Sequence, residues 1–149
     1  MAEVSAASRE MIERLIAFDT TSRNSNLELI EFIRSYLSEL GVESELVHDQ
    51  SGAKANLYAT LGPKDRGGIA LSGHTDVVPV DGQDWTRDPW KVVEQDGKLF
   101  GRGTCDMKGF IAVCLAWAPR FLEQARSMPV HFCFTYDEEV GCLGVRPLL

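Results

Sequence analysis

The chain has 149 residues, of which 44% are hydrophobic, and this length is enough for one domain with a core. Its 15 basic and 22 acidic residues give a formal net charge of −7, which argues against a surface for nucleic acid or anionic membranes, since both need clustered Lys and Arg. No apolar stretch approaches the roughly 18 residues of a membrane span, and Met1 to Ile12 lacks the pattern of a secretory signal. We therefore expect a cytoplasmic protein with reduced cysteines and with acidic residues that serve cations.

Helical and extended patterns alternate along the first half of the chain. Apolar residues at helical spacing predict amphipathic helices from Val4 to Phe18 and from Asn26 to Leu40. Strands are predicted at Val42 to Val47 and at Asn56 to Leu61, which could pair antiparallel, and a short apolar strand at Ile69 to Leu71 is expected to be buried.

The second half begins with an irregular loop from Pro79 to Pro89 and a hairpin through Asp96-Gly97. Met107 to Phe121 predicts a helix that is apolar on most sides and therefore well buried, and Val130 to Tyr136 predicts a last strand. Strands that alternate with helices favour an α/β sheet covered by helices on both faces.

Polar residues follow the ends of these apolar elements. They are His74 with Asp76, Asp106 before the apolar helix, and Asp137 to Glu139 after the last strand. Because the carboxyl ends of parallel strands meet at one edge of a sheet, we expect these side chains to converge. Carboxylates gathered in one cleft repel one another unless a cation neutralises them, and a histidine with several carboxylates suits zinc, cobalt or manganese.

Each of these groups also has a purely structural explanation. His74 could be satisfied by backbone groups, although Asp76, two residues along an extended segment, can fix its second ring nitrogen. Asp106 could cap the following helix, and Asp137 to Glu139 could be a solvated loop. Cys105 is an alternative metal ligand.

Four stretches, SGHTDVVP, DWTRDPW, DGKLFGRGTCDMKG and FTYDEEVGCLG, occur in an order and spacing that resemble a known family. It is the family of dinuclear zinc hydrolases that includes acetylornithine deacetylase, succinyl-diaminopimelate desuccinylase, aminoacylase and related carboxypeptidases. The resemblance covers essentially the whole chain. It implies a three-layer α/β sheet with helices on both faces, in which residues 1–149 form the N-terminal part of the catalytic domain.

The resemblance also implies a role for each candidate residue. His74 would bind one zinc ion, Asp106 would bridge two, Glu139 would bind the other, and Asp76 would orient His74. Two ions about 3.5 to 4 Å apart, for which cobalt can substitute, lower the pKa of a bridging water and polarise the substrate carbonyl. Glu138 would act as general base and then as general acid toward the leaving amine.

Within the family, GRGTCDMKGF and DEEVGCLGVR are most similar to the acetylornithine deacetylases. This similarity implies a small N-acyl amino acid substrate, hydrolysis of N-acetylornithine in arginine biosynthesis, and a homodimer of the full-length protein. Desuccinylase or peptidase specificity is the alternative.

The chain stops at Leu149, whereas the family pattern continues to another acidic ligand and a late histidine and includes a lid or dimerisation domain. His48 and His131 are poorly placed to replace these ligands. We therefore expect a fragment with little or no activity of its own and with apolar surface that favours association. A non-catalytic relic that binds at most one metal ion is the competing interpretation.

Overall fold

The computed structural model describes residues 5–125 and 127–149. Its elements, in chain order, are α1 (Ala6–Ile16), α2 (Leu27–Glu39), β1 (Ser44–His48), β2 (Ala55–Leu61), β3 (Ile69–His74), β4 (Val93–Gln95), β5 (Lys98–Phe100), α3 (Lys108–Gln124), β6 (Val130–Thr135) and a 3₁₀ turn, η1 (Arg146–Leu148). Every predicted helix and strand is confirmed within a few residues of its predicted ends. Val4, where the first helix was predicted to begin, lies outside the described residues.

Four strands form one sheet in the order β1-β2-β6-β3. β1 pairs antiparallel with β2, as expected, and β2 pairs antiparallel with β6, whereas β3 runs parallel to β6. The predicted mixed α/β class is therefore confirmed. His74 at the end of β3 is opposite Thr135 at the end of β6, so the residues that follow these two strands start from the same edge of the sheet.

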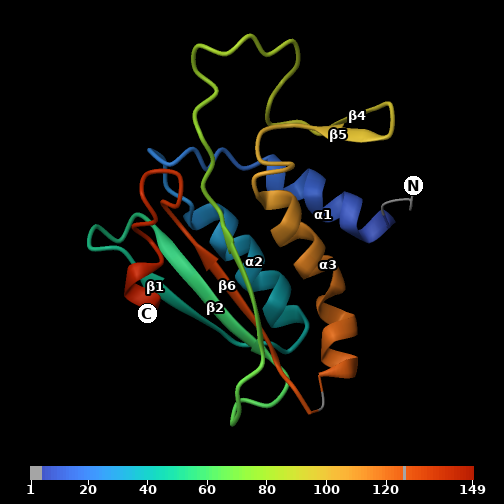
Figure 1. Cartoon of the computed structure of the whole chain (residues 1–149), viewed down its shortest axis with the longest axis vertical. Coiled ribbons are helices and arrows are strands. Elements are labelled where there is room, and N and C mark those ends of the chain that lie inside the picture. The colour runs from blue at the N-terminus through green and yellow to red at the C-terminus, as the bar shows by residue number, and fades with distance from the viewer. Residues whose placement is uncertain (1–4, 126) are drawn as a thin grey trace.

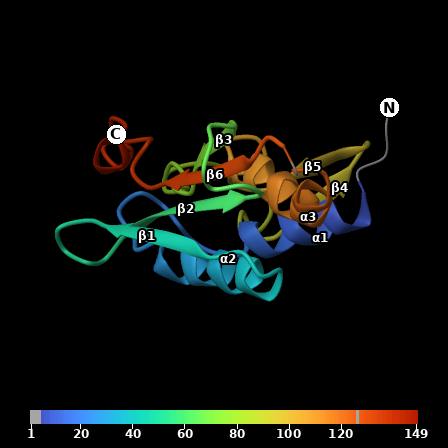
Figure 2. The same cartoon turned by 90° about the horizontal axis from the view of Figure 1, so that it is seen from below.

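All three α-helices lie on one side of this sheet (Figure 2). The face toward the helices is fully buried and carries Leu57, Leu61, Phe132 and Phe134. The opposite face carries the alternate side chains of β2 and β6, such as His131, and these are only half-buried. The second helical layer of the predicted three-layer fold does not occur within residues 5–125 and 127–149.

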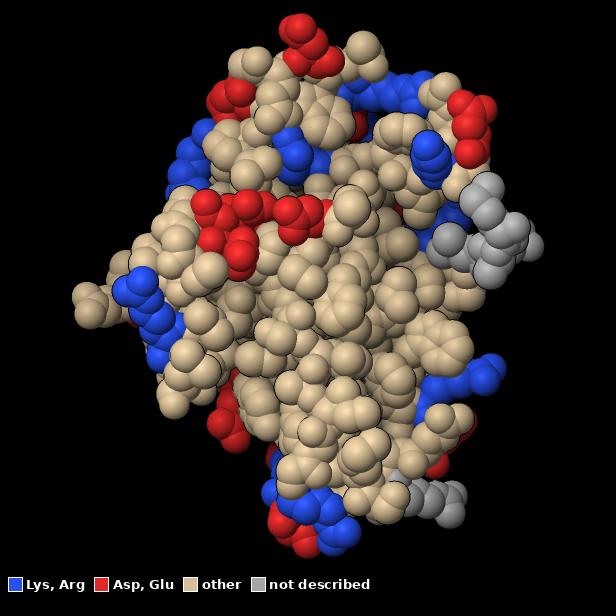
Figure 3. Space-filling model, in the orientation of Figure 1, with Lys and Arg blue, Asp and Glu red and all other residues tan. Residues whose placement is uncertain are grey.

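Two expectations about burial are wrong. Ile69 is 48% exposed, because β3 is an edge strand of the described sheet and has a neighbour on one side only. In α3, Phe110, Val113 and Trp117 are exposed, because this helix packs against α1 and the sheet with its other side only. In the view of Figure 3, a broad area without charged side chains lies below a group of acidic ones.

A long connection joins β3 to the β4–β5 hairpin and projects beyond the end of the sheet (Figure 1). It begins with a parallel bridge between Val77 and Thr21, which ties the segment after α1 to the segment after β3. None of the helices in the described ranges is long and apolar enough to cross a membrane.

Candidate metal centre

His74 is the last residue of β3 and is buried, with both ring nitrogens facing oxygen atoms. Nδ1 lies 2.9 Å from the backbone carbonyl oxygen of Asp76, and Nε2 lies 2.9 Å from Oδ1 of Asp106. Only an imidazolium can donate hydrogen bonds from both nitrogens. Burial lowers the pKa of His74, but these hydrogen bonds and the negative charges of Asp76 and Glu138 outweigh it and raise the pKa above 6.5.

The predicted convergence of acidic residues on His74 is present. His74, Asp106 and Glu139 each offer one ligand atom, and these atoms lie within 4.8 Å of one another. Oε2 of Glu138 lies 3.7 Å from Nε2 of His74. Side chains from β3, from the residue before the N-cap of α3 and from the turn after β6 therefore meet at one point.

The structural explanations for two of these groups do not hold. The N-cap of α3 is Met107, and no side chain caps this helix, so Asp106 faces His74 instead. The side chain of Asp137 is only 15% exposed, so the turn from Asp137 to Glu139 is not simply a solvated loop. Cys105 is exposed and does not belong to the cluster of ligand atoms.

The charge balance of the cluster favours a bound cation. Burial raises the pKa of Glu139, and the negative charges of Asp106, Asp76 and Glu138 raise it further, whereas His74 acts in the opposite direction. A divalent ion would favour the charged carboxylates and the neutral imidazole at once. One imidazole with carboxylate oxygens is a donor set that zinc accepts, and it is less suited to metals that prefer thiolates. The residues present therefore fit a zinc-type ion.

Asp76 contacts His74, but in a different way from the one that the motif implies. The backbone carbonyl accepts the hydrogen bond from Nδ1, whereas the carboxylate Oδ1 lies 3.7 Å from this nitrogen. The buried carboxylate instead accepts hydrogen bonds from the hydroxyl of Ser22 at 2.7 Å and from the amides of Glu138 and Glu139 at 3.0 and 3.2 Å. Asp76 thus connects His74 to the turn that carries both glutamates.

Sequence reasoning missed two buried polar residues, one bonded to Asp76 and one at the start of α3. Ser22 is buried and bonded to Asp76, and only its place in a Thr-Thr-Ser run between two helices could have drawn attention to it. Lys108 is fully buried, and its Nζ donates to the carbonyl oxygens of Leu15 and Phe18 at the end of α1. Burial lowers the pKa of Lys108 to about 7. A lysine in the first turn of an otherwise apolar helix was the available signal.

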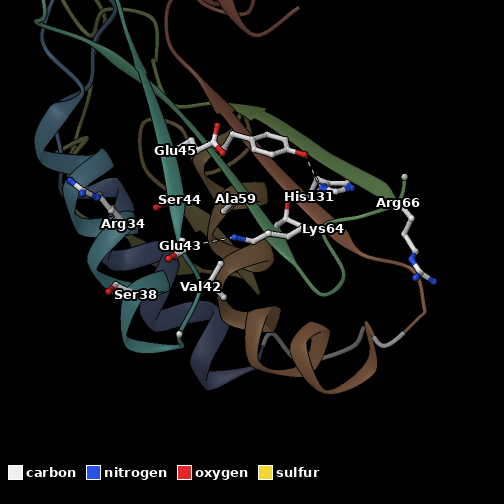
Figure 4. Close-up of a pocket in the computed structure, with 14 residues that line it drawn as sticks. Arg34, Ser38, Val42, Glu43, Ser44, Glu45, Ala59, Lys64, Arg66 and His131 are labelled. Atoms are coloured by element: carbon white, nitrogen blue, oxygen red, sulfur yellow. Dashed lines mark hydrogen bonds and ion pairs between the residues drawn. The ribbon is translucent and has the colours of Figure 1, made fainter.

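A cavity of about 910 Å³ lies elsewhere, around the start of β1 (Figure 4). Its cationic side chains already have acidic partners: Lys64 pairs with Glu43, Arg34 with Glu31 and Arg66 with Asp65. The Nδ1 atom of His131 lies within hydrogen-bond distance of the hydroxyls of Tyr58 and Thr60. The cationic side chains of this cavity are therefore already paired with carboxylates.

A smaller cavity, of about 230 Å³, adjoins the metal-ligand cluster. Its lining includes His74 and Glu138, together with Ser72, Met107, Tyr136 and Cys142. A small molecule in this space would contact the one ligand histidine and the glutamate predicted to be the general base.

Known proteins are similar to this chain in sequence. The model of peptidase family M20/M25/M40 matches residues 70–149. The acetylornithine deacetylase of Pasteurella multocida (strain Pm70) is 40% identical over 147 residues, which cover 94% of this chain and 38% of the relative. That of Photorhabdus laumondii subsp. laumondii is 43% identical over 133 residues, or 87% and 34% of the two chains. The chain thus spans little more than a third of the length of these relatives.

Solved structures share the fold. Human carnosine dipeptidase 1 superposes with a TM-score of 0.78 at 26% identity, over 95% of this chain and 34% of that one. The M20 family metallo-carboxypeptidase Sso-CP2 of Sulfolobus solfataricus reaches 0.81 at 19% identity, over 97% and 34%. The family match spans more than half of the chain and includes His74, Asp106 and Glu139. On this basis the chain belongs to peptidase family M20/M25/M40, in agreement with the metal-dependent hydrolases that its motifs resemble.

Proposed function

We propose that this chain is the metal-binding part of a two-metal amidohydrolase that converts N-acetylornithine to ornithine and acetate in arginine biosynthesis. The observation that carries the proposal is the meeting of His74, Asp106 and Glu139, with Glu138 beside them. The names of the relatives at 38 to 43% identity, all acetylornithine deacetylases, favour this acyl substrate over others.

In this proposal His74 and Glu139 would hold different zinc ions, and Asp106 would be a ligand of both. Cobalt can take the place of zinc, because both accept nitrogen and oxygen ligands. Bound at such a site, the ions lower the pKa of water and polarise the substrate carbonyl. Asp106 suits a shared position, because its side chain is 73% exposed and one of its oxygens already faces His74.

Glu138 is the proposed general base and acid. Its carboxylate lies beside His74 and is 45% exposed, so it can accept a proton from water and deliver it to the departing amine. Its neighbour Glu139 belongs to the cluster of ligand atoms, so the adjacent carboxylates divide the work. Asp76 keeps both in place through its hydrogen bonds to their amides.

The proposal extends to the substrate class, the location and the assembly of the protein. The substrate is a small N-acyl amino acid, not a nucleic acid or a membrane, in keeping with the net charge of −7. We also propose a cytoplasmic location and a homodimer for the complete protein.

The decisive test is acetate release from N-acetylornithine with Zn²⁺ or Co²⁺ present, beside N-succinyl-diaminopimelate and a dipeptide. It should be run on the complete gene product and on its Glu138→Gln variant. Acetate release that Glu138→Gln lowers by at least about 100-fold supports the proposal. A preference for the succinylated substrate or the dipeptide would reassign the protein to another activity of the same family.

The 149-residue chain alone is expected to have little or no activity. The ligand cluster in the described residues contains one histidine and two carboxylates, too few to complete the coordination of two ions. The alternative of a non-catalytic relic predicts fewer than two Zn²⁺ per chain in a titration and no hydrolysis with any metal. Two bound ions with activity in the 149-residue chain would contradict both expectations.

A further inference from the structure

Lys54, just before β2, makes two close polar contacts in a half-buried place. Its Nζ lies 2.5 Å from Oδ1 of Asp137 and donates to the backbone carbonyl of Ser22 at 2.6 Å. The side chains of Lys54 and Asp137 are 17% and 15% exposed. Such a pair is less screened by water than a surface salt bridge, and loss of one partner leaves the other charge uncompensated.

These contacts close a ring of interactions around the turn after β6. Ser22, which Lys54 binds through its carbonyl, donates its hydroxyl to the carboxylate of Asp76. That carboxylate accepts hydrogen bonds from the backbone amides of Glu138 and Glu139. The turn is therefore held at two points: the side chain of its first residue by Lys54 and the next two amides by Asp76.

The first residue of the turn needs such support. Asp137 has a φ of +52°, in the left-handed region that L-residues other than Asn and Asp seldom adopt. Its carbonyl oxygen accepts a hydrogen bond from the backbone amide of Leu143 at 3.0 Å, and this bond closes the turn. If its carboxylate rotated out to water, the backbone of Glu138 and Glu139 would lose one of its two anchors.

We propose that Lys54 is a positioning residue of the metal centre, which holds Glu138 and Glu139 in place through Asp137 and Ser22. The inference rests on the proposed function, because the placement of these glutamates matters to chemistry only if they serve the metal. Lys54 belongs neither to the cluster of ligand atoms nor to the lining of the adjoining 230 Å³ cavity, and it acts through the turn.

The Zn²⁺ affinity of the complete gene product, measured by calorimetric titration, distinguishes a positioning role of Lys54 from an effect of its charge alone. Removing a cation near a cation site strengthens metal binding if only Coulomb repulsion matters. If Lys54 positions Glu139, Lys54→Met instead weakens Zn²⁺ binding, by about 10- to 100-fold, as is usual when the partners of metal ligands are lost. Lys54→Arg keeps the ion pair and should restore most of the affinity. Lys64→Met is the matched control, because it removes one lysine from an exposed ion pair in the remote cavity.

Amide hydrogen exchange of the metal-free chain provides a second readout. In Lys54→Met, and equally in Asp137→Asn, the amides of Glu138 and Glu139 should exchange at least about tenfold faster, because the turn opens more often. The double variant should exchange no faster than either single one, since each breaks the same pair. Urea unfolding confirms that each variant is folded.

Unchanged exchange of these two amides in Lys54→Met, or Zn²⁺ bound as tightly as by Lys64→Met, overturns the proposal. If the unaltered complete gene product binds no Zn²⁺, the proposed function fails, and the exchange rates alone then decide whether Lys54 positions the turn.

Discussion

Nε2 of His74 lies 2.9 Å from Oδ1 of Asp106, a residue 32 positions further along the chain. The same nitrogen is the one that a metal ion would take, since Nδ1 is already bonded to the carbonyl of Asp76. A metal ion and a proton therefore compete for one atom.

This competition makes metal binding dependent on pH. Because the pKa of His74 is raised above 6.5, the proton persists to a higher pH than on an ordinary imidazole. Below that raised pKa, Zn²⁺ affinity should fall by about tenfold per pH unit, as one proton must leave for each ion bound. Calorimetric titrations in buffers with different ionisation enthalpies count the protons released. An affinity that does not change between pH 5.5 and 7.5 would contradict the assignment of His74 as a ligand.

Lys108 makes the free energy of unfolding depend on pH between about 7 and 10.5. Its folded pKa is about 7, compared with 10.5 in the unfolded chain, because burial disfavours the charged amine. The unfolded chain therefore binds more protons between these values, and the free energy of unfolding rises with pH. The difference in this free energy between the unaltered chain and Lys108→Met should increase by about 1 kcal/mol from pH 7 to 8. Urea unfolding at both pH values measures it, and equal differences would show that Lys108 keeps its ordinary pKa.

Gly109 permits a close contact between α3 and the loop that carries Asp106. A Cβ atom at this position would overlap the carbonyl oxygen of Thr104, whereas one at Gly67 would meet nothing within 4 Å. Gly109→Ala should lower the free energy of unfolding by about 1 to 3 kcal/mol, the usual range for overpacking. Gly67→Ala is the control and should change it by less than about 0.5 kcal/mol. Equal effects of the two substitutions would mean that the loop yields without strain.

The four cysteines should differ in reactivity. Cys105 and Cys142 are exposed, whereas Cys114 is buried within α3, and burial raises its pKa to about 11. Alkylation with iodoacetamide at pH 8 should modify the exposed Cys105 first and Cys114 last, because the thiolate is the reactive species. Cys142 should react after Cys105, because partial desolvation and the negative charge of Glu138 raise the pKa of its thiol. Peptide mass spectrometry gives the order, and denatured chain, in which all four thiols react, is the control. Early modification of Cys114 would show that α3 opens readily.

The sequence predicted the local structure and the meeting of His74, Asp106 and Glu139 better than it predicted burial and the contacts of Lys54 and Ser22. Helices and strands follow from side-chain spacing, and His74, Asp106 and Glu139 follow from motifs that are short and contiguous. Burial was predicted less well, because Ile69 and Trp117 are apolar in a pattern that does not reveal which neighbours cover them. Lys54 and Ser22 could not be identified, since their partners lie 83 and 54 residues away.

These long separations determine when the metal centre can form during folding. Each contact closes a large loop whose entropy must be lost before the contact stabilises anything. When β3 and β6 pair within the sheet, backbone hydrogen bonds and apolar contacts close these loops. Of the candidate metal ligands, His74 alone belongs to these strands. We therefore expect a metal ion to bind after the sheet has formed, so chelation should empty the site and leave the sheet intact.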